Sequence, residues 1–198
     1  MGLGDRLRKM SGKTRFVVSR IFVHLSGSEA TPLLGILNQV AFDAIDADGE
    51  MEVLGQGLAS VCEGLLQYDE FWRSAGNEGE VFWKEEDAGD FFNELFTDSG
   101  SRYLSEMSYE ELPEEDLLTL PPTGNLVVMV TVAYEGELET LETNLAEFEA
   151  LQEGLRSLIS LTYGESLRAI QIHYSPAQLG DELTDEQVLL NFPELIPL

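Results

Sequence analysis

The sequence has very few of the side chains from which most catalytic and metal sites are built. Of its 198 residues only one is cysteine and two are histidine, which excludes an intramolecular disulfide and leaves no recognisable zinc-ligand spacing. No apolar run reaches the roughly 18 to 20 residues of a membrane-spanning helix, and the N-terminus lacks the apolar region and cleavage site of a secretory signal. We therefore expect a protein of a reducing compartment that holds no metal and no cofactor.

The few reactive side chains fit structural roles better than chemical ones. Cys62 lies on the apolar side of a helical pattern, which favours a small core residue over a reactive thiol. The segment 46–49 suggests a calcium loop, but with Gly49 at the sixth position the first and twelfth ligands would be Ala44 and Gly55. The Gly-x-Ser-x-Gly motif of serine hydrolases is absent. We assign no catalytic, cofactor-binding or metal-binding residue and expect the protein not to be an enzyme.

Charge divides the chain into a short basic arm and an acidic body. Residues 1–20 hold six basic side chains and one acid, a net charge of +5, whereas residues 21–198 hold five basic side chains and 36 acids, a net charge of −31. Such a body repels phosphate backbones, so we expect no nucleic-acid binding. Six side chains are candidates for contact with an anionic lipid surface: Arg6, Arg8, Lys9, Lys13, Arg15 and Arg20. The competing interpretation is a solubilising arm that folds back on the acidic body.

Periodicity predicts one strand and three helices in the first half of the chain. Residues 16–25 are rich in β-branched and aromatic side chains and predict a strand. An interfacial amphipathic helix is the alternative there, because Arg20 and His24 share a helical face. Apolar positions spaced by three and four residues predict helices from Thr31 to about Ile45, from about residue 50 to 68, and from about residue 85 onward.

The second half predicts a βαβ unit followed by a short helix. Residues 107–124 are acidic, contain proline and read as a linker, and residues 126–133 form a nearly continuous apolar run that predicts the central strand of the sheet. A helical stripe over 141–159 and a strand over 167–174 then favour a right-handed parallel crossover. Thr184 and Gln187 form a capping box at the start of a last helix.

These elements predict an α+β fold with a small mixed sheet of about three strands, an N-terminal helical region, and a βαβ plus C-terminal helix unit. We divide the chain into a basic arm at 1–14, a strand and helical region at 15–106, a linker at 107–124 and a C-terminal region at 125–198. The regions 15–106 and 125–198 are expected to share one domain.

Several short motifs carry a family resemblance. They are Phe71-Trp72 after a helix, the Glu135-Gly136 turn after the apolar strand, Tyr174-Ser175-Pro176, Asp181-Glu182-Leu183, and the C-terminal sequence Phe192-Pro193-Glu194-Leu195-Ile196-Pro197-Leu198. With these motifs, residues 15–198 resemble a domain-of-unknown-function family of cyanobacteria and plastids that includes the plant fluctuating-light acclimation protein. Tyr174 stands where that family usually has Trp. Many of its members also carry a transmembrane stretch that this sequence lacks, so membrane anchoring is not inherited.

The resemblance implies a non-enzymatic accessory or scaffold protein of oxygenic phototrophs, regulatory in photosynthetic acclimation and located in the cytoplasm or the plastid stroma. We expect its protein partner, whose identity the sequence does not give, to dock on the sheet and the C-terminal tail. The candidate contact residues are Tyr174, Pro176, Phe192, Pro193, Leu195 and Pro197.

Two alternatives stay open. One is a peripheral membrane protein that binds anionic lipid of the thylakoid through the basic arm, and an enzyme of unknown type ranks third. We also expect the tail to act first as an intramolecular clamp, packed on the sheet edge beside Tyr174 and the Glu135-Gly136 turn.

Overall fold

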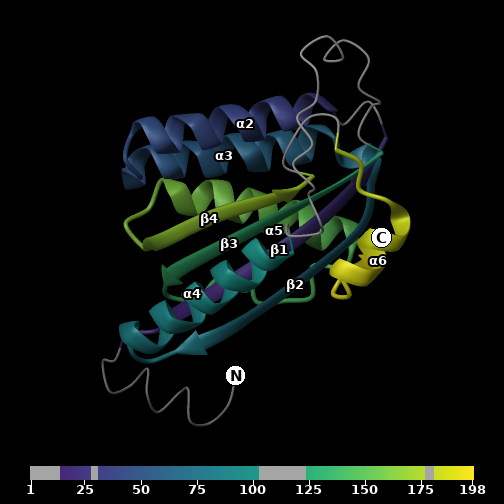
Figure 1. The fold of residues 1–198 in the computed structure, drawn as a ribbon. Coiled ribbons are helices and arrows are strands. Elements are labelled where there is room, and N and C mark those ends of the chain that lie inside the picture. The colour runs from purple at the N-terminus through teal and green to yellow at the C-terminus, as the bar shows by residue number, and fades with distance from the viewer. Residues whose placement is uncertain (1–13, 28–30, 103–123, 177–180) are drawn as a thin grey trace.

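A computed structural model describes residues 14–27, 31–102, 124–176 and 181–198, in which helices cover both faces of one sheet (Figure 1). The sheet has five strands in the order β4-β3-β1-β2-β5, and every neighbouring pair is antiparallel. The strands are β1 (Phe16–Ser26), β2 (Trp72–Phe82), β3 (Asn125–Glu135), β4 (Leu167–Ser175) and β5 (Ile196–Pro197). The two strands of the first half of the chain, β1 and β2, lie between strands of the second half, so neither half could complete the sheet alone.

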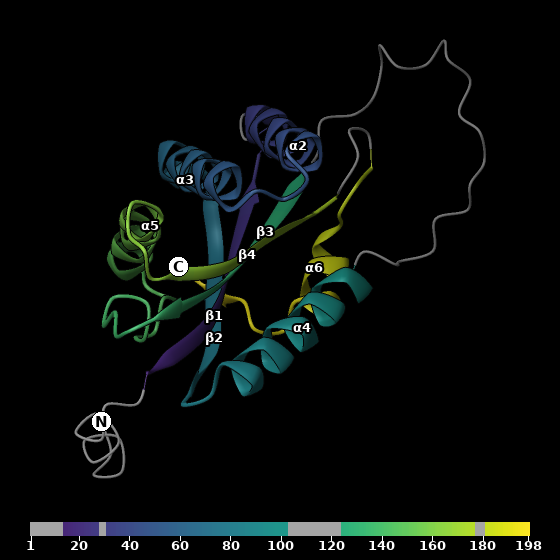
Figure 2. The ribbon, with the colours of Figure 1, turned by 90° about the vertical axis from the view of Figure 1, so that its left-hand side faces the viewer.

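Figure 2 shows two helical layers separated by the sheet. On one face lie α2 (Thr31–Asp46), α3 (Met51–Gln67) and α5 (Phe148–Thr162), and on the other lie α4 (Glu85–Ser101) and α6 (Asp185–Asn191). A short 3-10 turn, η2 (Asp69–Phe71), leads from α3 into β2.

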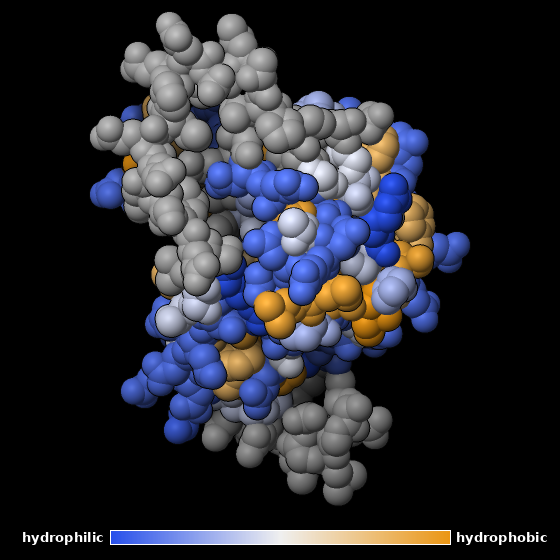
Figure 3. All heavy atoms as spheres, turned by 45° about the vertical axis from the view of Figure 1, so that its right-hand side comes forward, coloured by the Kyte–Doolittle hydropathy of each residue, from blue (hydrophilic) through white to orange (hydrophobic). Residues whose placement is uncertain are grey.

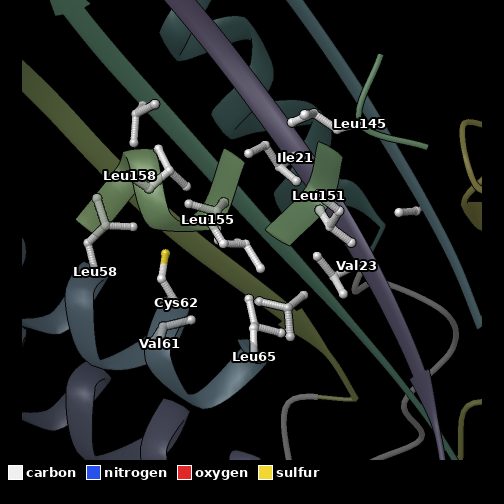
Figure 4. Close-up of a cluster of buried hydrophobic side chains, with 14 of the residues drawn as sticks. Ile21, Val23, Leu58, Val61, Cys62, Leu65, Leu145, Leu151, Leu155 and Leu158 are labelled. Atoms are coloured by element: carbon white, nitrogen blue, oxygen red, sulfur yellow. The ribbon is translucent and has the colours of Figure 1, made fainter. Parts of the chain in front are cut away.

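The main core lies under α3 and α5. Because side chains alternate along a strand, β1 sends Ile21 and Val23 to this face, where they meet Leu65, Leu151 and Leu155 from the helices (Figure 4). All five side chains are fully buried. Leu58, Val61, Cys62, Leu145 and Leu158 line the same cluster in Figure 4, so Cys62 is the small core residue that its pattern predicts.

Most predicted elements are confirmed. The strands at 16–25, 126–133 and 167–174 correspond to β1, β3 and β4, and the three N-terminal helices correspond to α2, α3 and α4. The capping box at the start of α6 is formed in both directions, because the Gln187 amide nitrogen donates to the Thr184 hydroxyl and the Gln187 side chain accepts from the Thr184 amide.

The predicted sheet of about three strands is wrong, because β2 and β5 were missed. β2 carries polar residues and two glycines where a typical strand carries β-branched side chains. Both glycines stand where another backbone comes close: a Cβ on Gly76 would lie 2.3 Å from the carbonyl oxygen of Glu194, and a Cβ on Gly79 would lie 2.6 Å from that of Val18. The two glycines that lower the strand propensity of β2 are therefore required by the close approach of the neighbouring backbones.

The predicted parallel crossover between β3 and β4 is also wrong. The two strands are antiparallel, with Val130 opposite Ile172. The helical stripe was read as starting at residue 141, whereas α5 begins at Phe148. The segment 137–147 instead leads the chain toward the other end of the sheet, where Phe148 stacks against Trp72, and α5 returns from there. A chain that leaves and re-enters at the same end must form an antiparallel pair.

Two further expectations concern position along the sheet and along the chain. β3 is an interior strand, but the middle of the sheet is β1, which pairs with both β2 and β3. Apart from Thr14 and Gly124, the predicted arm at 1–14 and the predicted linker at 107–124 lie outside the described residues.

Candidate functional site

The C-terminal clamp, defined here as α6 together with residues 192–198, closes over the face of the sheet opposite the main core. Phe192 is 1% exposed and packs with Phe22 of β1 and with Val127 and Met129 of β3. Val188 turns the inner side of α6 to the same cluster. Leu183 of the Asp181-Glu182-Leu183 motif joins the same cluster, and the clamp is therefore the intramolecular element that was expected.

The clamp sits at the opposite edge of the sheet from the expected one. The tail adds β5 to the outer edge of β2, with Ser74 opposite Pro197 and Ala75 opposite Ile196. Tyr174 belongs to β4, at the far edge of the sheet. The expectation that the tail packs beside Tyr174 and the Glu135-Gly136 turn is therefore wrong.

A chain of ion pairs ties the tail to the sheet through α4. Arg102 at the end of α4 donates to Glu194 of the tail at 2.7 Å, and it pairs with Asp98 at 2.9 Å. Asp98 also accepts from Arg20 of β1 at 2.7 Å, and Arg20 in turn pairs with Glu78 of β2. Arg20 is 2% exposed, so the acids in this series of ion pairs neutralise a fully buried guanidinium.

Arg20 and Arg102 affect the pKa values of two carboxylates, Asp98 near the end of α4 and Glu194 in the tail. Burial acts to raise the pKa of Glu194, but hydrogen bonds and the charge of Arg102 offset it and leave that pKa lowered. The same balance, with Arg20 and Arg102 as partners, lowers the pKa of Asp98. Both carboxylates are ionised at neutral pH, so the ion pairs between Arg102 and these two acids hold the tail against α4.

A second polar chain crosses the sheet under the clamp. The Asn125 side-chain nitrogen donates to the carbonyl oxygen of Leu183 at 2.9 Å and to Asp185 at 2.8 Å, so its oxygen is left to accept from Nε2 of His24 at 3.0 Å. The Ser74 hydroxyl then donates to Nδ1 of His24 at 2.9 Å. Desolvation lowers the pKa of His24 and so favours the neutral ring, in which Nδ1 accepts from the Ser74 hydroxyl.

The order Ser, His, Asn resembles that of a nucleophile, its base and an orienting group, but the surroundings differ from those of an active site. Ser74 and His24 are 8% and 9% exposed. Pro197 of the tail lies opposite Ser74 in the ladder. A nucleophile has to be within reach of its substrate. We therefore assign the Ser74–His24–Asn125 hydrogen bonds a structural role, in which they hold β1, β2 and β3 against α6. Sequence spacing gives no signal for it, since His24 and Asn125 are 101 residues apart.

The candidate contact residues fall into two groups. Pro193 and Pro197 are exposed, whereas Phe192 is buried and Leu195 packs partly against the same cluster. At the other edge Tyr174 is half-buried and Pro176 is buried. The structure therefore brings the tail residues together and separates them from Tyr174 and Pro176.

The apolar side chains that the clamp turns outward are different ones. Leu189 and Leu190 on the outer face of α6 are 79% and 77% exposed, and Ile196 and Leu198 of the tail are 52% and 39% exposed. Figure 3, turned toward the side on which α6 and the C-terminus lie, shows hydrophobic side chains gathered among hydrophilic ones. The sequence alone gives no signal for this pair. Once Val188 is known to face inward, the next two residues of the helix must face outward.

Two of the lipid-contact candidates are engaged within the fold. Arg20 is buried in the ion-pair chain and is not available to a lipid surface. Arg15 pairs with Glu142 and donates to the carbonyl oxygen of Gly136. Arg6, Arg8, Lys9 and Lys13 lie outside the described residues.

Within the described residues, no group of three or more His, Cys, Asp or Glu side chains is arranged to hold a metal ion. The described helices also include none that is both long and apolar enough to span a membrane. Burial raises the pKa of the Cys62 thiol, which keeps it protonated in the core.

Comparison with known families found a match over most of the chain. Residues 15–198 match the model of a family described as "Protein of unknown function (DUF1517)". Neither the search of curated proteins nor the search of solved structures found a match.

Proposed function

Since the chain belongs to the DUF1517 family of proteins of unknown function, we propose that it is a non-enzymatic accessory protein that binds a protein partner through the outer face of its C-terminal clamp. The resemblance to the plant fluctuating-light acclimation protein supports a place in oxygenic phototrophs, with a regulatory role in photosynthetic acclimation. It also supports a location in the cytoplasm or the plastid stroma.

The observation that carries this proposal is the pair Leu189 and Leu190, which a helix of only seven residues holds almost fully in solvent. A helix this short is marginal by itself. Here its N-terminus is closed by the capping box and its inner side is packed on Phe22 through Val188. The two leucines are therefore presented on a rigid support, which reduces the ordering cost of binding a partner.

The proposal is tested by affinity capture from a phototroph lysate with three forms of the full chain. The double variant Leu189→Glu with Leu190→Glu removes the apolar contact but leaves the inner side of α6 unchanged. Tyr163→Glu is the matched control, because Tyr163 is 82% exposed at the end of α5, away from the clamp.

We expect the parent and the control to retain the same specific partner and the double variant to lose it, while all three melt at similar temperatures. A partner that binds all three forms equally would place the binding surface elsewhere. Loss of binding together with loss of folding would be resolved with the single variant Leu189→Ser.

A further inference from the structure

The edge of the sheet far from the clamp is formed by the long strand β4. β4 pairs with β3 along one side, and no described residue forms a strand along the other. Edge strands are usually protected by charged side chains, prolines or short length. β4 has nine residues and a single Asp, Glu, Lys or Arg, the Arg168 at its start, which is paired with Glu135 at 2.7 Å. Its backbone is therefore a template for another extended segment.

An apolar trough lies beside this edge, between β4 and α2. Its volume is about 100 Å³, which suits the insertion of one aliphatic side chain. The trough is lined chiefly by Val40, Ala41, Ala44, Ile170, Ile172 and Tyr174. The Tyr174 hydroxyl donates to the Asn38 side-chain oxygen at 2.7 Å and links the two walls. A segment added to β4 would turn every second side chain toward this trough.

The wall formed by the helices has charge of one sign. Residues 21–72 contain no Lys and no Arg, whereas residues 31–72 contain eight acids. Asp43, Asp46, Glu50 and Glu52 are exposed on α2 and around the start of α3. A cationic segment would be attracted to this region and an anionic one repelled.

We propose that the outer edge of β4, with the trough beside α2, binds an extended basic segment of a partner protein as a sixth strand of the sheet. On the face that turns toward α2, this segment carries one apolar side chain and a basic side chain two residues before and two residues after it. The backbone pairs with β4, the apolar side chain enters the trough, and the two basic side chains on the same face of the segment meet the acids of the helical wall. A second copy of this chain is a poor occupant because each copy carries a net charge of −26. This site is additional to the proposed clamp surface and lies at the other edge of the sheet.

The test uses a synthetic nine-residue peptide with valine at its centre, lysine two residues before and two residues after the valine, and threonine at the other positions. It is titrated into the full chain and followed by fluorescence anisotropy. Two control peptides match it, one with glutamate in place of lysine and one with N-methyl groups on alternate backbone amides. We expect only the unmodified lysine peptide to bind, with an affinity that falls as salt is added. Hydrogen exchange of the complex should show added protection in β4.

Two exposed neighbours on α2 provide the matched variants. Ala41→Arg places a long cationic side chain over the trough, whereas Phe42→Arg adds the same charge at a side chain that does not line it. We expect Ala41→Arg to weaken binding at least about tenfold and Phe42→Arg to change it by less than about threefold. Equal binding by Ala41→Arg and the parent would overturn the proposal, as would tight binding of the N-methylated peptide.

Sedimentation of the full chain and of a chain that begins at Thr14 tests the other occupants. A dimer that Ala41→Arg dissociates would assign the edge to a second copy. Peptide binding that appears only after removal of residues 1–13 would assign the edge to the basic arm. Either result would overturn the assignment to a partner protein. The clamp variants at Leu189 and Leu190 should leave peptide binding unchanged, so the two proposals can fail separately.

Discussion

The two faces of the sheet are built from the same strands but differ in chemistry. Toward α2, α3 and α5, β1 and β3 present the aliphatic side chains of one large cluster, among them Ile21, Val23 and Val130. The alternate positions of β1 and β3 face α4 and α6, and they include Arg20, His24 and Thr131, which are each at most 9% exposed. The apolar clusters on this second face are smaller and are separated by the polar chains.

The difference shows how the two layers are held. Apolar burial is non-directional and tolerates many arrangements of similar volume. A buried guanidinium with four partner groups on β2 and α4 is satisfied in far fewer arrangements. We infer that the first face supplies most of the stability, while the second fixes where α4 and the clamp sit. Mutations on the two faces can therefore distinguish a contribution to stability from a contribution to the placement of α4 and the clamp.

The largest expected effect contrasts two adjacent residues of β3. Val130→Asp places an unpaired carboxylate at a side chain that is 1% exposed in the main core, and should cost more than about 4 kcal/mol of unfolding free energy. Thr131 faces the other way, and its fully buried hydroxyl has no hydrogen-bond partner in the structure. Thr131→Val should therefore leave stability unchanged or raise it by about 1 kcal/mol.

Urea unfolding of the parent and both variants measures these changes. If Val130→Asp unfolds at the same urea concentration as the parent, the first face is not a closed core. If Thr131→Val is clearly destabilised, the hydroxyl has a bound water or another partner that the contacts do not include.

The sequence could predict the first face but not the second. Aliphatic periodicity identified β1, β3, β4 and the helices, because burial in a continuous core leaves a repeating pattern in the chain. The polar chains leave none: Arg20 meets Glu78, 58 residues away, through sheet register alone. Arg20 was accordingly grouped with the basic arm, although β1 starts four residues before it.

The candidate site was predictable in the same partial way. The capping box and the burial of Phe192 follow from local spacing and from the cost of exposing aromatic surface. The edge on which the tail lies depends on β2, whose Gly76 admits the tail backbone and gives no strand signal. The outward pair Leu189 and Leu190 became recognisable only when the inner side of α6 was known.

A smaller effect is expected for Arg20→Met, which keeps the length of the side chain but removes its charge. Glu78 and Asp98 are 37% and 41% exposed, so water can solvate them after the change, and the cost should be about 2 to 3 kcal/mol. Glu78→Gln is the matched control and should cost less than about 1 kcal/mol, because the amide oxygen still accepts from Arg20.

Hydrogen exchange distinguishes the proposed role of this network from simple stabilisation. In Arg20→Met we expect α4 and the clamp to lose protection before α3 and α5 do. Uniform loss of protection in all helices would contradict the separation between a stabilising face and a positioning face.

The smallest expected effect concerns pH and His24. Desolvation lowers the pKa of His24 below its usual 6.5, against the opposing effects of Asn125 and Asp185 and with a small further lowering by Arg73. The unfolded chain therefore takes up the proton more readily, and the stability that His24 contributes is present above about pH 6.5 and is lost as pH falls through the folded pKa.

His24→Gln keeps hydrogen-bonding groups at this position but removes the titration. The difference in unfolding free energy between parent and variant should therefore shrink as pH falls from about 7.5 to about 5. His173, whose pKa is also lowered by desolvation, is present in both proteins and cancels in the comparison. A difference that stays constant over this range would mean that folding does not shift the pKa of His24, and a difference that grows as pH falls would mean that the ring is charged in the fold. That result would reverse the assigned direction of the hydrogen bond from Ser74 and weaken the case that the second face positions the clamp.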